Sequence, residues 1–480
     1  MFKEIDNKRL YPLTAAQRLH FFTLKYCPKK QVLNIGTSLT INEDINFNIL
    51  KESIYEAYSR CESMRLRFVS DSEGNVMQYV ADKEERDIEF YDFSDWKMED
   101  AELKMREWTE TPFERENSPL NKIIMIVTPD NYKGIYLLVD HMTMDAQSII
   151  VFLKDIIEIY CSKKYDGMNY PKEMYSYIKQ IEKDLAYEAE SKAKNRDTHY
   201  FKELIETSEP IYNDINGIER LLEERNLRGN ENIRNVTNVS NNVDANVSNN
   251  VDANITVFNL EEYPSYILMK FCEENKIPIV CLLMMGLRTY LQKVNYQDDV
   301  SIMSTIARRA TISEKKSGGT RLHCFPCRTI VSKDETFLEG IEKIREVQNS
   351  LFRHANFNPV EYLSYRTKFY DNKQGQTYEP FSLTYQPLTM KNTKSMLGQT
   401  IDFSDIDYKT NWYSNGVCAH ALYLTVMHRA NDNGLNFSFE YQTGRVNEEK
   451  LQYMYYYICK ILFEGINNPD KTVGEIIESV

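Results

Sequence analysis

The sequence feature that most constrains the fold of this chain is an apolar, strand-like run that leads directly into a histidine. Residues 136–139 are apolar, and Asp140 and His141 follow them without a break. A second carboxylate, Asp145, comes four residues after His141. A short apolar run of this kind is typical of a strand. The stretch therefore predicts a strand that delivers an imidazole and two carboxylates to one end.

A one-sided helical pattern begins directly after this stretch. Its apolar positions are Ile149, Phe152, Leu153, Ile156, Ile157 and Tyr160. This spacing places them on one face of an amphipathic helix. Asp145 then lies near the N-terminus of the helix, where the helix dipole favours a carboxylate.

Strands and helices alternate along both halves of the chain. The first half predicts a strand–helix–strand unit and a hairpin that ends at Asp140, and the second half closes with a hairpin and a helix. The predicted strands are residues 37–41, 64–69, 123–127, 134–140, 255–260, 300–306, 323–330, 381–385, 421–429 and 434–441. The predicted helices are residues 46–60, 262–274, 278–294, 336–352 and 448–463.

Two arginines share one face of the predicted strand 64–69. Arg65 and Arg67 alternate there with apolar neighbours. Two interpretations remain open: one guanidinium points inward toward an acid, or the face is solvated.

A charged helical stretch at about residues 173–205 is expected to connect the two halves, and an asparagine-rich segment follows it. Between residues 207 and 255 the apolar periodicity disappears, and residues 238–245 are repeated directly as residues 246–253. A repeat of eight residues is too short for a solenoid unit. We expect an exposed, low-complexity insertion that tolerates change.

The net charge and the number and spacing of the cysteines exclude some classes of function. The net charge of −13 and the pI near 5.3 argue against nucleic acid as a partner, since phosphate binding needs a basic surface. Nine scattered cysteines and a charged start predict a cytoplasmic protein, and no apolar run is long enough to span a membrane. Cys324 and Cys327 lack a second ligand pair at zinc-site spacing, so buried free thiols are favoured over a metal.

Several short motifs occur in the order typical of one family. They are Thr14-Ala15-Ala16-Gln17, Arg60 to Phe68, Asp140 to Ala146, Tyr200 to Leu204, Asp298 to Ile302, Ser304 to Arg309 and His354 to Glu361. Together they resemble motifs of the condensation domains of nonribosomal peptide synthetases, within the chloramphenicol-acetyltransferase-like superfamily. The family signature H-H-x-x-x-D-G keeps its second histidine and its aspartate here, as His141 and Asp145.

The resemblance implies an α+β fold of two-layer α/β sandwiches. Two acetyltransferase-like subdomains, residues 1–185 and 186–480, would form a V-shaped pseudo-dimer with the insertion 207–255 in the second. A tunnel between them would receive substrates on the phosphopantetheine arm of a carrier protein. The protein itself would bind no cofactor and no metal.

The resemblance also assigns roles to residues. His141 would act on the attacking amine as catalytic base. Asp145 would pair with Arg65 in a structural role, since a buried carboxylate needs a partner. Asp140, Ala146 and Ser148 would support the site. The candidates for the tunnel or the interface are Arg308, His323 and Tyr385.

Three functions remain open at this stage. The first is an acyltransferase that forms an amide, or an ester, from a carrier-protein thioester and a small amine or aminoacyl acceptor. The second is a heterocyclisation domain, because Asp140, Asp145 and Ser148 satisfy D-x-x-x-x-D-x-x-S. The third is a silent relative that only recruits partners. The protein is expected to be a monomer and to act on carrier proteins in trans, because no adenylation or carrier segment is recognised.

Overall fold

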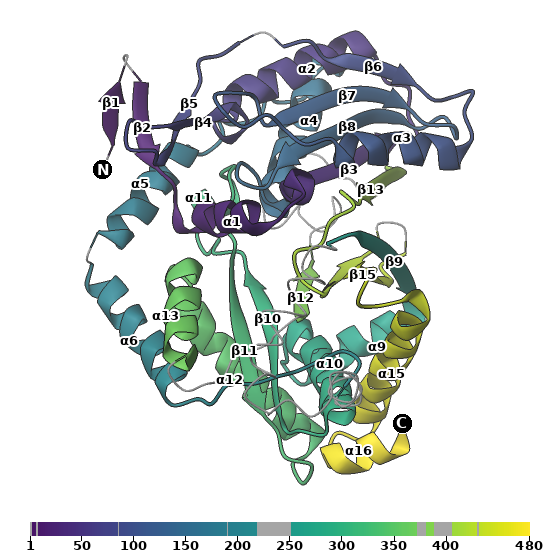
Figure 1. Ribbon diagram of the computed structural model, residues 1–480. Coiled ribbons are helices and arrows are strands. Elements are labelled where there is room, and N and C mark those ends of the chain that lie inside the picture. The colour runs from purple at the N-terminus through teal and green to yellow at the C-terminus, as the bar shows by residue number, and fades with distance from the viewer. Residues whose placement is uncertain are drawn as a thin grey trace. The chain divides into compact units, whose positions relative to one another are not determined.

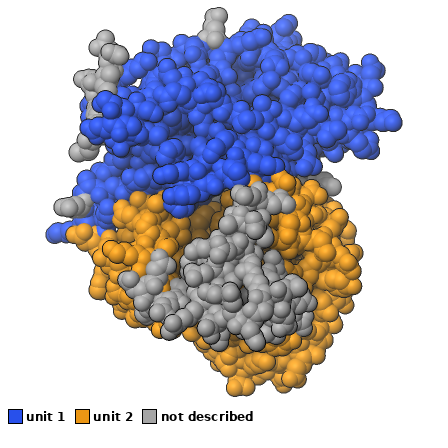
Figure 2. Space-filling model, in the orientation of Figure 1, with its two compact units in different colours: residues 1–194, 307–322, 387–417 blue, residues 195–306, 323–386, 418–480 orange. Residues whose placement is uncertain are grey.

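The strands and helices of the computed structural model gather into two units (Figures 1 and 2). The structure describes residues 2–5, 8–84, 86–189, 191–217, 251–371, 381–387, 406–429 and 432–480. Unit 1 comprises Met1–Lys194, Ala307–Leu322 and Pro387–Val417, and unit 2 comprises Asn195–Ile306, His323–Gln386 and Cys418–Val480. This division differs from the predicted one because two segments of the second half pack within unit 1.

The main sheet of unit 1 has the strand order β13-β3-β8-β7-β6. The central strand β8 (Lys133–Asp140) pairs antiparallel with β3 (Asn34–Ile41) and with β7 (Asn121–Val127). The edge strand β13 (Tyr408–Tyr413) comes from the second half of the chain and pairs with β3. The Thr37 hydroxyl donates a hydrogen bond to the Asn411 carbonyl, 374 residues away. The last strand, β6 (Glu89–Asp92), is parallel to β7.

Helices cover both faces of this sheet. On one face, α2 (Phe47–Arg60) packs against α4 (Ala146–Lys164) (Figure 1). On the other, α3 (Met98–Glu110) packs its Ala101 and Met105 side chains against strand residues that include Tyr136. Burial on both faces explains why β8 is a continuous apolar run without polar alternation.

The rest of unit 1 consists of a second sheet and several shorter elements. A second sheet has the order β1-β2-β5-β4. The remaining elements are β1 (Lys3–Ile5), β2 (Lys8–Pro12), α1 (Ala15–Tyr26), η1 (Lys30–Leu33), η2 (Ser63–Arg65), β4 (Leu66–Ser70), β5 (Val76–Val80), α5 (Tyr177–Glu188) and α11 (Ile312–Lys315). Helix α6 (Lys192–Glu206) runs from the end of unit 1 into unit 2.

Unit 2 is built on a six-stranded sheet of order β11-β10-β12-β14-β15-β9. Its strands are β9 (Ala253–Leu260), β10 (Asp299–Ile306), β11 (His323–Ile330), β12 (Phe381–Gln386), β14 (Leu422–His428) and β15 (Leu435–Gln442). Its helices are α9 (Glu262–Glu274), α10 (Ile279–Asn295), α12 (Phe337–Arg353), α13 (Pro359–Asp371), α15 (Glu448–Asn467) and α16 (Val473–Ser479). The predicted closing hairpin is confirmed as β14 and β15, and the predicted α+β class is confirmed.

The prediction of an exposed insertion at residues 207–255 is wrong at both ends of that range. Asn213 and Asp214 are buried, and the Asn295 side chain accepts from the Asp214 amide at 2.9 Å. Val251 is also buried, and Ala253 begins β9. These ends are ordered because their backbone groups find partners in the core of unit 2. Residues 218–250, with most of the repeat, lie outside the described residues.

In the described ranges no individual helix has the length and apolar character needed to cross a membrane. Only α9 and α10 taken together reach that length and composition, and they are bent by 112°.

Candidate active site

The loop between β8 and α4 carries the predicted catalytic group. The His141 amide donates to the Leu33 carbonyl at 2.8 Å, and the Thr143 amide donates to the Asp140 carbonyl at 2.9 Å. Backbone bonds therefore fix the path of the loop on both sides of the histidine. The His141 side chain is half-buried, and its Nδ1 has no hydrogen-bond partner among the described residues.

Asp140 holds the first end of this loop. Its carboxylate accepts from Arg115, with the Nη2 atom at 2.6 Å and the Nε atom at 2.9 Å, and from the Met142 amide at 2.8 Å. Burial raises the pKa of Asp140, while Arg115 and the Met142 amide act against that rise. The side chain is fully buried. Its oxygens are thus used to shape the loop.

Asp145 holds the other end. It caps α4 by accepting from the Ser148 amide at 2.9 Å, and the Ser148 hydroxyl accepts from the Asp145 amide at 2.8 Å. Arg309 Nη2 donates to both Asp145 oxygens, at 2.8 and 2.9 Å. Burial acts to raise the pKa of Asp145, but the Arg309 guanidinium and the Ser148 amide hold it below its ordinary value. Asp145 is therefore an ionised anchor.

The predicted partner of Asp145 was wrong. Arg65 ends the short helix η2, and its guanidinium donates to the Ala81 carbonyl instead. The open question about this strand is settled by Arg67, which is buried and pairs with Glu84. Asp145 pairs with Arg309 instead, because the segment 307–322 of the second half packs within unit 1.

The electrostatics favour a neutral His141. Burial lowers the pKa of His141, while the carboxylates of Asp145 and Asp140 act to raise it. The net shift of the His141 pKa is downward, because burial is the largest of these effects. A neutral imidazole can accept a proton.

The condensation-domain profile matches residues 7–477. The chain belongs to the condensation-domain family. It is 22% identical to a subunit of plipastatin synthase from Bacillus subtilis (strain 168) over 473 residues, which cover 98% of this chain and 17% of that protein. It is also 22% identical to surfactin synthase subunit 1 of the same strain over 479 residues, which cover 97% of this chain and 12% of that protein. This condensation domain thus spans less than a fifth of either relative.

Solved condensation domains share its fold. The first condensation domain of the calcium-dependent antibiotic synthetase, in complex with a substrate analogue, matches with a TM-score of 0.76 and 18% identity, covering 97% of this chain and 98% of that one. A double mutant of the starter condensation domain of rhizomide synthetase, in complex with C8-CoA and Leu-SNAC, matches with a TM-score of 0.77 and 15% identity, covering 98% of this chain and 96% of that one. The recognised family and fold are confirmed.

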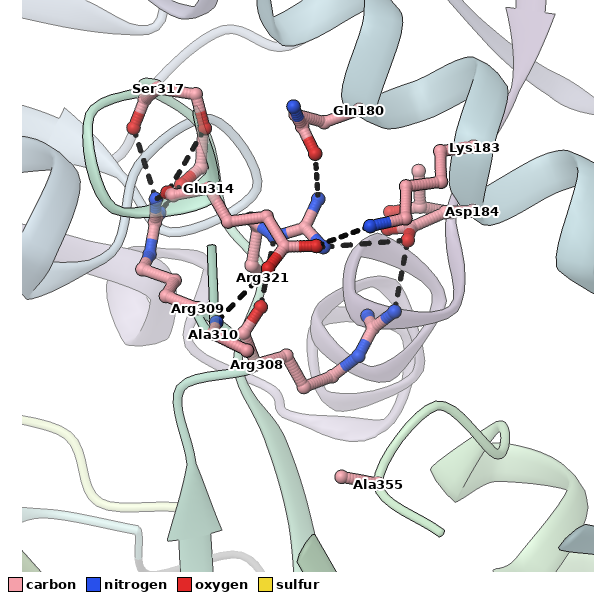
Figure 3. A network of polar contacts seen from close by, with 12 residues as sticks. Gln180, Lys183, Asp184, Arg308, Arg309, Ala310, Glu314, Ser317, Arg321 and Ala355 are labelled. Carbon is pink, nitrogen blue, oxygen red and sulfur yellow. Dashed lines mark hydrogen bonds and ion pairs between the residues drawn. The ribbon is translucent and has the colours of Figure 1, made fainter. Parts of the chain in front are cut away.

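Three arginines of this condensation domain form a network with Asp145, Asp184 and Glu314. Figure 3 shows the part of the network that contains Asp184 and Glu314. The three arginines all come from the segment 307–322. Besides Asp145, Arg309 binds the carbonyls of Glu314, Ser317 and Gly319. Arg321 lies 3.6 Å from both Asp184 and Glu314, and its amide donates to Asp145 at 3.0 Å. The segment is therefore fixed by charge pairs at both of its ends.

Glycine is required at one point of this segment. Gly319 has a φ of +91°, and a Cβ atom there would lie 2.0 Å from the ring of Tyr177. A side chain would strain the backbone and collide with a buried ring. The Gly319 carbonyl that receives Arg309 thus depends on the missing Cβ.

Arg308 supports the site in a way the sequence did not show. It was a candidate for the tunnel, but its guanidinium pairs with Asp184 of α5 at 2.9 Å and is buried. Its φ of +52° lies in the left-handed region, which arginine rarely adopts. The ion pair makes Arg308 part of the network. Its assignment to the tunnel or the interface stays a prediction.

The other predicted residues divide between the two units. Ser148 belongs to the cap of α4, and Ala146 is its first residue and half-buried. His323 and Tyr385 belong to unit 2. The His323 Nδ1 lies 2.8 Å from the Ala355 carbonyl, and the Tyr385 hydroxyl lies 2.7 Å from the His428 Nε2. Their assignment to a tunnel stays a prediction.

Three residues of the site were missed from the sequence. Arg115, Arg309 and His20 contact the loop 140–145 or its anchors. Arg309 closes the motif Ser304 to Arg309, so its position was available, but its partner was not. Nothing in the spacing of Arg115 or His20 indicated this site.

Proposed function

We propose that this condensation domain transfers an acyl or aminoacyl group from a carrier-protein thioester to an amine and forms an amide bond. The donor arrives on the phosphopantetheine arm of the carrier, so the chain needs no cofactor of its own. In this proposal the domain acts as a monomer on carrier proteins supplied in trans in the cytoplasm.

The placement of His141 carries the proposal. Its ring is half-buried while both neighbouring carboxylates are paired with arginines. Asp140 and Asp145 hold the loop and cannot act as bases without breaking buried ion pairs. The imidazole is therefore the group of this loop that remains for proton transfer.

The chemistry balances with this one base. The amine nitrogen attacks the thioester carbonyl carbon, the C–N bond forms, and His141 takes the proton that the nitrogen loses. The C–S bond then breaks, and the proton passes to the departing thiolate, which leaves as the free thiol of the arm. His141 is neutral again at the end.

Intact-mass analysis of reaction mixtures tests the proposal. The probes are C8-CoA with Leu-SNAC, which occupy the similar rhizomide synthetase domain, and a panel of acyl-loaded carrier proteins with amines. We expect a new amide mass for at least one pair and loss of the acyl group from its donor. Absence of any amide over the whole panel, with loaded carriers intact, would contradict the proposal.

The pH profile of the reaction follows from the state of His141. Protonation removes the base, so kcat/KM falls as the pH drops through the His141 pKa. Because burial lowers that pKa below the ordinary 6.5, we expect the acid limb of the profile to lie below pH 6.5. Rates measured between about pH 5 and 8 check this. A midpoint above pH 6.5 would contradict a base whose pKa is lowered by its surroundings.

A further inference from the structure

A second histidine lies directly on the ring of His141. The ring centroids of His20 and His141 are 4.1 Å apart and their planes differ by 24°, so the two imidazoles are stacked. His20 is 7% exposed. The contact lies within unit 1 and involves the group to which the proposed function assigns the proton transfer.

Helix α1 places His20 there. Thr14 and Gln17 form a capping box that fixes the start of the helix. The buried positions Ala16, Gln17, His20 and Leu24 follow the helical period, so His20 lies on the inward face. The Gln17 side chain donates to the Met142 carbonyl at 3.3 Å, one residue beyond His141. The inward face of α1 thus covers the loop 140–145.

The segment 307–322 holds the other side of His20. The His20 Nε2 lies 3.2 Å from the Thr320 hydroxyl. Thr320 stands between Gly319, whose carbonyl binds Arg309, and Arg321, whose amide binds Asp145. The same three residues therefore fix both His20 and the Asp145 anchor.

We propose that His20 is a positioning residue that holds the His141 imidazole in the orientation required for proton abstraction, an inference that rests on the proposed function. The stacked ring restricts rotation of the His141 ring, and the bond to Thr320 restricts His20 in turn. Stacking leaves the edge of the His141 ring, with its nitrogens, free of His20. Orientation of this kind acts on the chemical step because a misplaced base loses much of its effect.

The charges around the pair favour two neutral rings. Burial lowers the pKa of His20 well below its ordinary value, and the neighbouring His141 acts in the same direction. The charged groups on the surrounding elements are Asp140 with Arg115, Asp145 with Arg309, and Arg321, whose guanidinium lies against Asp184 and Glu314. Burial outweighs the stabilisation that the Asp145 and Asp140 carboxylates give to a protonated His141, so the neutral form is favoured.

Two substitutions distinguish the effect of stacking by the His20 ring from the effect of its titration. His20→Phe keeps a flat ring that cannot titrate, and His20→Leu removes the ring while keeping the site apolar. The full chain is labelled at the Cε1 atoms of its seven histidines, and the His141 NMR signal is assigned by its loss in His141→Ala. Urea midpoints from tryptophan fluorescence show whether each variant is folded.

For His20→Leu we expect the His141 signal to shift and broaden. With any donor–acceptor pair that the wild type accepts, we expect kcat to fall about tenfold at unchanged KM. His20→Phe is expected to keep the wild-type line width and a kcat within about twofold. A His141 signal and a kcat that are unchanged in folded His20→Leu, or an equal loss in both variants, would overturn the proposal.

The NMR result does not depend on activity. If the wild type transfers nothing over the whole panel, the proposed function fails. The signal of His141 in His20→Leu still shows whether His20 holds the ring.

Discussion

Replacing His141 by alanine is expected to lower the rate of acyl transfer by about 10²–10⁴-fold, the range that a positioned general base supplies. Both carboxylates of the loop stay paired with Arg115 and Arg309 in the variant, so neither replaces the lost base. The loss should appear in kcat, because the proton is transferred in the transition state and not on binding.

Amide formation is measured by intact mass with the donor–acceptor pair that gives the fastest wild-type reaction. His199→Ala is the matched control, since the His199 side chain is 85% exposed on α6 and should change the rate little. Equal product formation by wild type and His141→Ala would end the catalytic interpretation. The silent, recruiting function that the sequence left open would be favoured only if the amount of product also equals that of a reaction without protein.

Replacing Arg309 by alanine is expected to destabilise unit 1 by about 3–5 kcal/mol, the cost of leaving one member of a buried ion pair without its partner. The Arg309 and Asp145 side chains are only 3% and 6% exposed. Besides Asp145, three backbone carbonyls lose the hydrogen bond from Arg309. Arg309→Lys keeps the charge but cannot reproduce the planar fork, so it should recover part of the loss.

Tryptophan fluorescence in urea measures the expected loss of stability in unit 1. All three tryptophans of the chain, Trp96, Trp108 and Trp412, belong to unit 1. The control is Arg106→Ala, which removes a half-exposed pair with Glu110 and should cost at most about 1 kcal/mol. A urea midpoint of Arg309→Ala equal to that of Arg106→Ala would show that the pair does not hold the loop.

The hydrogen-bond and ion-pair partners of Asp140 and Asp145 show what each carboxylate does. Asp140 is the residue that distinguishes this chain from the family signature and that left cyclisation open. Its carboxylate is fully buried against Arg115 and the Met142 amide, which favours a structural role. Asp145 kept its predicted structural role, but with Arg309 in place of Arg65.

Short-range signals were predicted well. The strand that ends at Asp140, the helix that begins after Asp145 and the closing hairpin are all present. Each depends on periodicity or on a cap within a few residues. The domain boundary depended on contacts between distant segments, because residues 307–322 and the described residues 406–417 pack within unit 1.

By itself the sequence determined the family, the alternation of strands and helices, and His141 at the end of a buried strand with Asp145 capping the next helix. Only the tertiary structure decided which side chains hold that histidine: Arg115 on Asp140, Arg309 on Asp145, and His20 on the ring. The physical reason is the distance along the chain between the residues that interact. A cap or an amphipathic period is formed by neighbours in the chain, whereas Asp145 and Arg309, 164 residues apart, meet only through the path of the folded backbone.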